Sequence, residues 1–534
     1  RDAEAEREIR MMENRFSDDV STRVMGQSYA WLGNRMMAEH YLSAAVAEDP
    51  KDMFREQALA RYHMINKRPN LAIPHLNSIL ENKLSAGVPM DALAVWARRS
   101  LARVLASLSN HSAFREALAL LEANRNDKKF EAPDTSLKGL LLASRTEPIY
   151  RKNGLSLLES VSQDDLETDA RLALAQLYFV GDRWSDCREV MQALLIDNPT
   201  DIRLLGQYVA MLIEREEWPQ AEIWLRQLQE RAPADNNTIR LVALSAKGRN
   251  KSQQAKEIVE SLVPEGNQLA DPEKVLVSAR MYEELKMYTA AEDAYRALAN
   301  RDIQYRLALA GYLARRGKLD ESFKICDTLF TKETAVQICA IGLSAAVQHV
   351  DDLTPDQNLL IEQWIERAQR EVANPVNLLT QQASLLSARG EYQKALDLLN
   401  VVATASLNDN QRGLLANNRA YMNVRLGKGK ESLEEINTAI DLLGPRVEVL
   451  DTRAMIHLSR GEHQKAIEDL KEATMFPVKS GVYFFHLALA YQAADNRPAA
   501  KEALERAKDM QFLGDDVAPN EREQFDKLRR WLRH

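Results

Sequence analysis

The sequence GEYQKA at residues 390–395 returns as GEHQKA at residues 461–466. Each copy holds a glycine and, five positions later, an alanine, with apolar residues at helical spacing on both sides. A glycine supplies the positive φ angle of a tight turn that ends one helix, and an alanine lets two helix axes approach closely. The stretch therefore predicts a first helix, a tight turn and a second helix packed against the first.

A small residue in the same register returns along almost the whole chain. In the most regular parts the interval is 34 residues, as from Ser432 to Ala466 and from Ala466 to Ala500. The residues that share the register are Ala38, Ala72, Ala117, Gly154, Cys187, Ala221, Ala255, Ala291, Ser322, Ala395, Ser432, Ala466 and Ala500, with a degenerate repeat near Gln363. One helical pair of this length cannot bury its own apolar face, so successive pairs must stack into a solenoid.

The repeat resembles the tetratricopeptide repeat family over residues 15–510. The small, apolar or aromatic, turn and helix-ending residues of one unit are Gly26, Tyr29, Gly33, Ala38, Leu42, Ala45 and Pro50. The resemblance implies an all-α, right-handed superhelical solenoid of about 13–14 helix-turn-helix repeats with a C-terminal capping helix. The last repeats resemble the terminal repeats of large bacterial tetratricopeptide-repeat scaffold proteins.

Departures from the register indicate how the array is divided. Ala72 and Ala117 are 45 residues apart, which predicts a long loop near residues 82–91. The expected segments are N-terminal repeats at residues 1–160, central repeats at 161–350, C-terminal repeats at 351–518 and a capping helix at 519–534.

The expected capping helix has two sequence signals. Asn520 followed by Glu523 has the pattern of a capping box. One apolar stripe is formed by Phe525, Leu528, Trp531 and Leu532. A helix with a polar outer face would seal the end of the array, and an amphipathic helix for a membrane or a partner is the alternative.

The composition argues against several classes of protein. The formal net charge of −8 argues against a nucleic-acid binder, because phosphate contacts need a basic stripe. No apolar run has the length of a transmembrane helix, so we expect a soluble chain, in the cytoplasm or the periplasm. The three cysteines favour buried thiols over a disulfide framework or a metal site. Because the chain begins at Arg1, we expect a processed protein or a piece of a longer one.

The sequence patterns of common catalytic and cofactor sites are absent. The chain holds no phosphate-binding Gly-x-x-x-x-Gly-Lys-Ser/Thr, no His-Glu-x-x-His and no Gly-x-Ser-x-Gly. Its nine histidines are scattered, and most carboxylates are expected to be solvated on helix faces. We therefore expect no catalytic residue, no cofactor and no metal, and a protein that is not an enzyme.

In the family, the first helices of the repeats line a concave groove. Carried onto the C-terminal repeats, the groove positions are Asn377, Thr380, Ser384, Asn417, Tyr421, Arg425, Asp451, Met455, Phe485 and Leu489. Asn side chains can hydrogen-bond an extended peptide, and Tyr421 and Phe485 offer rigid anchors. Solvated helix faces are the alternative interpretation. Asp451 stands where a clamp for a terminal carboxylate would need a cation, so we expect no such clamp.

These observations together predict a non-catalytic scaffold. We expect it to bind a peptide or a partner protein in the groove, as part of a bacterial multiprotein assembly. One alternative is a regulatory or targeting arm of a larger enzyme whose catalytic domain lies outside this chain. Another is an envelope scaffold for polysaccharide or protein export. The sequence identifies neither the partner nor the oligomeric state.

Overall fold

The computed structural model describes residue 11 and residues 20–85, 92–108, 110–124, 131–263, 271–349, 353–371, 376–512, 514, 517 and 521–533. Within these residues every regular element is a helix and none is a strand, which confirms the all-α class. The chain divides into two compact units, residues 1–174 with 441–444 and residues 175–440 with 445–534. The segment boundaries expected at residues 160, 350 and 518 stay predictions.

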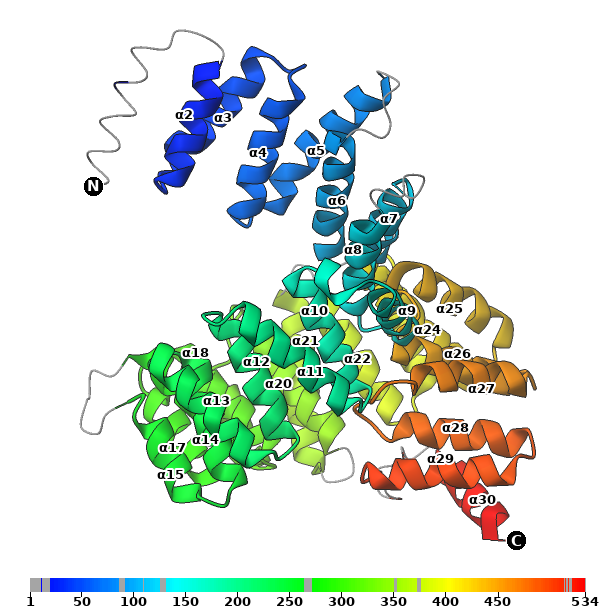
Figure 1. Ribbon diagram of the computed structural model, residues 1–534. Coiled ribbons are helices and arrows are strands. Elements are labelled where there is room, and N and C mark those ends of the chain that lie inside the picture. Colours follow the sequence, from blue (N-terminus) through cyan, green and yellow to red (C-terminus); the bar gives the residue numbers. More distant parts are fainter. Residues whose placement is uncertain are drawn as a thin grey trace. The chain divides into compact units, whose positions relative to one another are not determined.

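The first unit is built from consecutive helices (Figure 1). They are α2 (Val20–Trp31), α3 (Arg35–Glu48), α4 (Met53–Ile65), α5 (Pro69–Ser85), α6 (Ala92–Ser107), α7 (His111–Glu122), α8 (Glu131–Ala143) and α9 (Pro148–Glu159), followed by the 3-10 turn η2 (Gln163–Asp165). The division between the units falls within α10 (Thr168–Val180).

The second unit continues the same pattern to the end of the chain. Its helices up to residue 371 are α11 (Trp184–Asp197), α12 (Ile202–Glu214), α13 (Trp218–Arg231), α14 (Asn236–Gly248), α15 (Ser252–Glu260), α16 (Pro272–Glu284), α17 (Tyr288–Ala299), α18 (Ile303–Arg315), α19 (Leu319–Thr328), α20 (Ala335–Gln348) and α21 (Pro355–Glu371). The later ones are α22 (Val376–Ala388), α23 (Tyr392–Val402), α24 (Asp409–Arg425), α25 (Gly429–Leu443), α26 (Val447–Ser459), α27 (His463–Ala473), α28 (Val482–Ala493), α29 (Arg497–Asp509) and α30 (Arg522–Arg533).

Consecutive helices pack in pairs, such as α26 with α27 and α28 with α29. The predicted crossing residues lie at these contacts. Twelve of them have an exposed fraction of 0%: Ala38, Ala72, Ala117, Cys187, Ala221, Ala255, Ala291, Ser322, Ala395, Ser432, Ala466 and Ala500. At the thirteenth, Gly154, an added Cβ would lie 2.7 Å from the backbone nitrogen of Ala143, so only glycine fits. The small-residue register and the solenoid of helix pairs are confirmed.

The degenerate repeat differs from the expected register. Gln363 is exposed, whereas the next residue, Trp364, is fully buried in α21. The small residue of this pair lies on the first helix instead: a Cβ on Gly342 of α20 would meet the Trp364 ring at 3.2 Å. The large and small side chains have exchanged helices, so a search for a small residue on the second helix misses the crossing point.

The turns within the pairs share one backbone geometry. Gly390 and Gly461 have φ angles of +76° and +73°, and the residue after each donates its N–H to a carbonyl five residues earlier. The same position, five residues before the crossing residue, is held by a residue other than glycine in six turns: Lys67, Asp182, Glu216, Asn250, Lys286 and Asp495, with φ between +54° and +62°. These turns therefore keep the helix-ending hydrogen bond without glycine.

The structure corrects one expectation about the segments around the helices, and another falls on a residue that it does not describe. The loop expected to begin at residue 82 begins later, because α5 continues to Ser85; residues 86–91 lie outside the described part of the chain. The helix after the last repeat is present as α30, with Phe525 and Leu528 buried. Asn520, expected to cap it, also lies outside the described residues.

Overpacking the crossing point in α27 provides a test of the register. We expect Ala466→Trp to destabilise the second unit by about 1–3 kcal/mol, because a fully buried methyl group is replaced by a large ring. Thermal unfolding followed by circular dichroism measures the effect. Gln464→Trp, on the exposed side of the same helix, is the matched control. Equal melting curves for both variants would contradict the close crossing.

Candidate functional site

The predicted groove residues lie on the first helices of the last four pairs. Arg425 of α24 and Met455 of α26 line a cavity of about 570 Å³, which we call the outer cavity. Asn417, Tyr421 and Asp451 line a second cavity of about 390 Å³, the inner cavity. Ser384 also lines the inner cavity and Leu489 the outer one, so seven of the ten predicted residues are brought to two cavities within the same unit.

Three of the predicted residues line neither cavity. Asn377 is exposed on α22, and the hydroxyl of Thr380 donates to the carbonyl of Val376 in its own helix at 2.8 Å. Phe485 is buried, with an exposed fraction of 0%. Its ring packs against Phe512 and Phe525, at centroid distances of 5.7 Å and 5.5 Å. The neighbouring side chains of α28 face the cavities instead, so Phe485 is a core residue and not an anchor for a partner.

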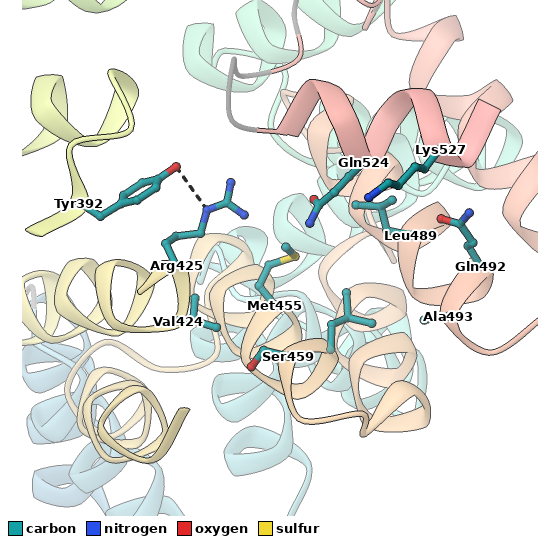
Figure 2. A pocket seen from close by; sticks show the side chains of 11 residues that line it. Tyr392, Val424, Arg425, Met455, Ser459, Leu489, Gln492, Ala493, Gln524 and Lys527 are labelled. Atoms are coloured by element: carbon teal, nitrogen blue, oxygen red, sulfur yellow. Dashed lines mark hydrogen bonds between the residues drawn. The ribbon is translucent and has the colours of Figure 1, made fainter. Parts of the chain in front are cut away.

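The outer cavity combines an apolar floor with a polar edge. Met455 and Leu489 supply apolar surface from α26 and α28, while Gln524 and Lys527 reach the cavity from α30. Figure 2 shows Tyr392 and Arg425 at one side of this cavity and Gln524, Lys527 and Leu489 at the other. The C-terminal helix therefore forms part of the wall of the groove.

A layer of four charged side chains connects the walls of the two cavities. Arg425 donates from Nη2 to Oε1 of Glu521 at 3.0 Å. Nε2 of His486 lies 3.4 Å from the same Glu521 oxygen, and Nδ1 of His486 lies 2.6 Å from Oδ1 of Asp451. The side chains of Arg425, His486 and Glu521 are 10%, 5% and 4% exposed, so little water screens the layer.

Two tyrosines support the arginine of this layer. The Arg425 guanidinium lies over the ring of Tyr421, 5.4 Å from its centroid, and Nε contacts the Tyr392 hydroxyl at 3.4 Å (Figure 2). A guanidinium over an aromatic face is stabilised by the ring quadrupole. Burial raises the pKa of the Tyr421 phenol well above its usual range, so the ring stays neutral beside the charges.

In this layer the opposite charges outweigh the effect of burial on the pKa values of His486 and Glu521. Burial alone would lower the pKa of His486, but the carboxylates of Asp451 and Glu521 raise it to about 10. Burial likewise acts to raise the pKa of Glu521, but His486 and Arg425 bring it below its usual value. At neutral pH His486 is therefore protonated, and Glu521 is ionised between it and Arg425.

The shifted pKa of His486 gives a direct titration test. Since the folded pKa lies above 6.5, the stabilisation is complete below the ordinary value and is lost as the pH rises through about 10. The contribution of Glu521 has the opposite sign: it is present above the ordinary value and is lost as the pH falls through the lowered one. We expect the His486 imidazole NMR signal, identified by its absence from His486→Gln, to stay unchanged between about pH 5 and 8. A titration near 6.5 would contradict the layer.

The inner cavity contains an unused hydrogen-bond acceptor. Oδ1 of Asn417 is buried and has no hydrogen-bond partner among the residues that the structure describes. A buried acceptor left unpaired costs free energy, about 1–3 kcal/mol, that a donor from a bound molecule would recover. An amide oxygen of this kind can accept a hydrogen bond from a backbone N–H.

Sequence reasoning did not identify His486, Glu521 or Gln524 as groove residues. The repeat spacing could have indicated His486. It lies 35 residues after Asp451, on the first helix of the following pair, and faces Asp451 from there. No repeat spacing could have identified Glu521, because this residue follows the last repeat.

The first unit has a cavity of its own on the first helices. It has a volume of about 640 Å³ and is lined by residues that include Trp31, Arg61 and Ile65. Trp31 and Ile65 are 34 residues apart and are 93% and 80% exposed. Large exposed apolar side chains at the same register position of neighbouring repeats are typical of an interaction surface.

The three cysteines of the chain are buried free thiols. Burial raises the pKa of the thiols of Cys187, Cys326 and Cys339 to about 12, which opposes formation of a nucleophilic thiolate. Within the described residues, no group of three or more His, Cys, Asp and Glu side chains is arranged to hold a metal ion. In the same part of the chain, no helix has both the length and the apolar character needed to cross a membrane.

Buried small residues at the crossing points and a shared turn geometry, repeated along stacked helix pairs, characterise the architecture. The chain is an all-α solenoid of stacked helix-turn-helix pairs. Among solved structures it is similar to a chain of the APC/C hetero-tetramer Cut9-Hcn1, at 15% identity, covering 93% of this chain and 92% of that one, with a TM-score of 0.36. It is also similar to a tetratricopeptide repeat protein from Parabacteroides merdae ATCC 43184, at 15% identity, covering 54% and 98%, with a TM-score of 0.29.

Neither likeness carries a role over to this chain. No family model and no curated protein matches its sequence. The function is therefore argued from the site.

Proposed function

We propose that this chain is a non-catalytic scaffold of tetratricopeptide-like repeats that binds a segment of another protein in the groove formed by α22, α24, α26 and α28. The unpaired Oδ1 of Asn417 in the inner cavity is the observation that carries the proposal, because a buried acceptor of this kind fits a peptide N–H. The apolar floor of Met455 and Leu489 next to it fits an apolar side chain of the same segment.

The composition of the groove favours a protein over other ligands. The outer cavity mixes apolar carbon with amide and ammonium groups from separate helices, as protein interfaces do. Nucleic acid is disfavoured by the net charge of −8. The exposed Trp31 and Ile65 of the first unit support a second contact surface, as expected of a scaffold that holds more than one protein.

Site-specific photo-crosslinking tests the proposed groove. A photoreactive phenylalanine analogue is placed at Gln492, which lines the outer cavity, and at Gln464, which is exposed on α27 as the matched control. The proposal requires that proteins from the source cells are crosslinked at position 492 at least about tenfold more than at position 464. Equal yields at the two positions would reject the groove as the binding surface.

A substitution in the inner cavity tests whether the partner binds in the groove or on the surface around it. Asn417→Leu removes the acceptor and leaves a side chain of similar size. We expect about tenfold weaker binding of the crosslinked partner, with unchanged helicity by circular dichroism. Asn377→Leu, at an exposed position outside both cavities, is expected to bind as the wild type does.

A further inference from the structure

The segment that follows the last repeat does more than cover the end of the array. A cap needs to pack only on the final pair, and α30 does so, contacting α28 and α29 through the buried Phe525 and Leu528. The residue just before α30 and the first turns of the helix make contacts beyond that pair. Glu521 reaches Arg425 of α24, 96 positions earlier in the sequence, and Gln524 and Lys527 line the outer cavity.

The contacts of Glu521 have the form of a recognition site for a carboxylate. One carboxylate oxygen is shared between the guanidinium of Arg425 and the imidazole of His486, at 3.0 Å and 3.4 Å. Each cation has its own support: Asp451 binds the far nitrogen of His486, and Tyr392 and Tyr421 hold Arg425. Charge-assisted hydrogen bonds from pre-arranged donors are the usual way in which a protein binds the acidic side chain of a partner.

The spacing of the contacts defines a short helical motif. The acidic residue Glu521 is followed four and seven positions later by Phe525 and Leu528, which are both buried. These three positions fall on one face of a helix. The other side of α30 is exposed and carries mostly charged residues, including Glu523, Asp526 and Arg530.

We propose that the segment from Glu521 through α30 is a built-in ligand of the groove and that a partner displaces it. This proposal rests on the proposed function. The partner that fits is an amphipathic helix with an Asp or Glu at its start and apolar residues four and seven positions later. Its carboxylate takes the place of Glu521 between Arg425 and His486. Its first turn then lies along the outer cavity, where Gln524 and Lys527 lie when the groove is closed.

Replacement is feasible because α30 is a weak element by itself. It has 12 residues, and an isolated helix of that length is marginal in water. Its ion pair between Lys527 and Glu523 is exposed on both sides and adds little. The attachment of the helix depends on the buried Phe525 and Leu528, on the partly buried Trp531 and Leu532, and on the carboxylate of Glu521. A partner of the same pattern supplies the carboxylate and the two buried apolar residues.

The first experiment measures the attachment of α30 in the full chain. Glu521→Gln keeps the shape of the side chain and removes its charge, and Glu523→Gln is the matched control on the exposed side of the helix. We expect amide hydrogen exchange in α30 to become about tenfold faster in Glu521→Gln and to stay unchanged in Glu523→Gln. Unchanged protection in Glu521→Gln would overturn the contact.

The second experiment uses a fluorescent peptide with the sequence of residues 514–534 as a probe of the vacated groove. By fluorescence anisotropy we expect it to bind full-length Glu521→Gln about tenfold more tightly than the wild type, and a peptide with Gln at the position of Glu521 to lose this gain. Leu528→Ala provides a second opened form that keeps all charges, and the same gain is expected. Faster exchange without any gain in peptide binding would overturn the groove as the receptor.

The crosslinking at position 492 distinguishes this proposal from the proposed function. We expect the yield of crosslinked partner to rise about tenfold in Glu521→Gln. If position 492 crosslinks a partner equally in the wild type and in Glu521→Gln, the built-in ligand is rejected and the scaffold function stands. If position 492 crosslinks no better than position 464 while the peptide still binds the opened forms, the scaffold function is rejected.

Discussion

Trp364→Ala is expected to lower the free energy of unfolding of the second unit by about 3–5 kcal/mol. The indole is fully buried, its Nε1 donates to Oδ1 of Asp327 at 3.1 Å, and its ring meets Phe323 edge-on at 5.4 Å. Truncation removes these contacts and leaves a cavity opposite Gly342, whose backbone packs closely against the indole ring. Hydrogen exchange in α20 and α21, together with urea unfolding, measures the loss.

The neighbouring residue provides the control for this prediction. Gln363 lies on the exposed side of the same helix, and we expect Gln363→Ala to change stability by less than about 0.5 kcal/mol. A second substitution tests the exchange of large and small side chains directly. Gly342→Leu clashes with Trp364 in the wild type but fills the space in Trp364→Ala, so it should be destabilising alone and partly restoring in the double variant. Additive losses would contradict the exchange.

Arg425→Ala is the second substitution with a large expected effect, about 3–5 kcal/mol. Among the described residues, it leaves the buried Glu521 with His486 as its one cationic partner, and it removes the side chain that lies over Tyr421. Most of the loss arises because desolvating a carboxylate is costly when its partner is removed. We expect a lower melting temperature and faster proteolysis near α30.

A second arginine of α24 isolates the effect of burial. Arg412 pairs with Asp409, and its side chain is 56% exposed, so water screens this ion pair. Arg412→Ala is expected to change the stability by less than about 1 kcal/mol. If the two variants melt alike, the buried charge layer does not hold the C-terminal helix in place.

The regularity of the chain explains which features its sequence could predict. The crossing residues were predictable because each pair imposes the same steric demand at the same spacing, as at Ala221 and Ala466. The repeat expected near Gln363 was only weakly marked, because the small residue of that helix pair is Gly342, on the first helix. A pattern of small residues on the second helix cannot reveal a crossing point where the small residue lies on the first helix.

The groove was predictable only in part, for a related reason. Arg425, Met455 and Asp451 follow the family positions, and the structure brings them to the cavities. The environment of Phe485 depends on Phe512 and Phe525, which come after the last repeat and have no counterpart in the earlier ones. The same holds for Glu521, whose contact with α24 is made by folding of the chain end and leaves no periodic signal.

The six turns that lack glycine leave room to make the array more heat-resistant. A side chain such as that of Glu216 or Lys286 is held at a φ near +57°, where a Cβ crowds the backbone at a cost of about 1–2 kcal/mol. Glycine would relieve this crowding, offset in part by its greater freedom in the unfolded chain. These residues lie neither at the buried crossing points nor in the cavities. Replacing them by glycine could therefore raise the melting temperature of the solenoid while its binding surfaces keep their present shape.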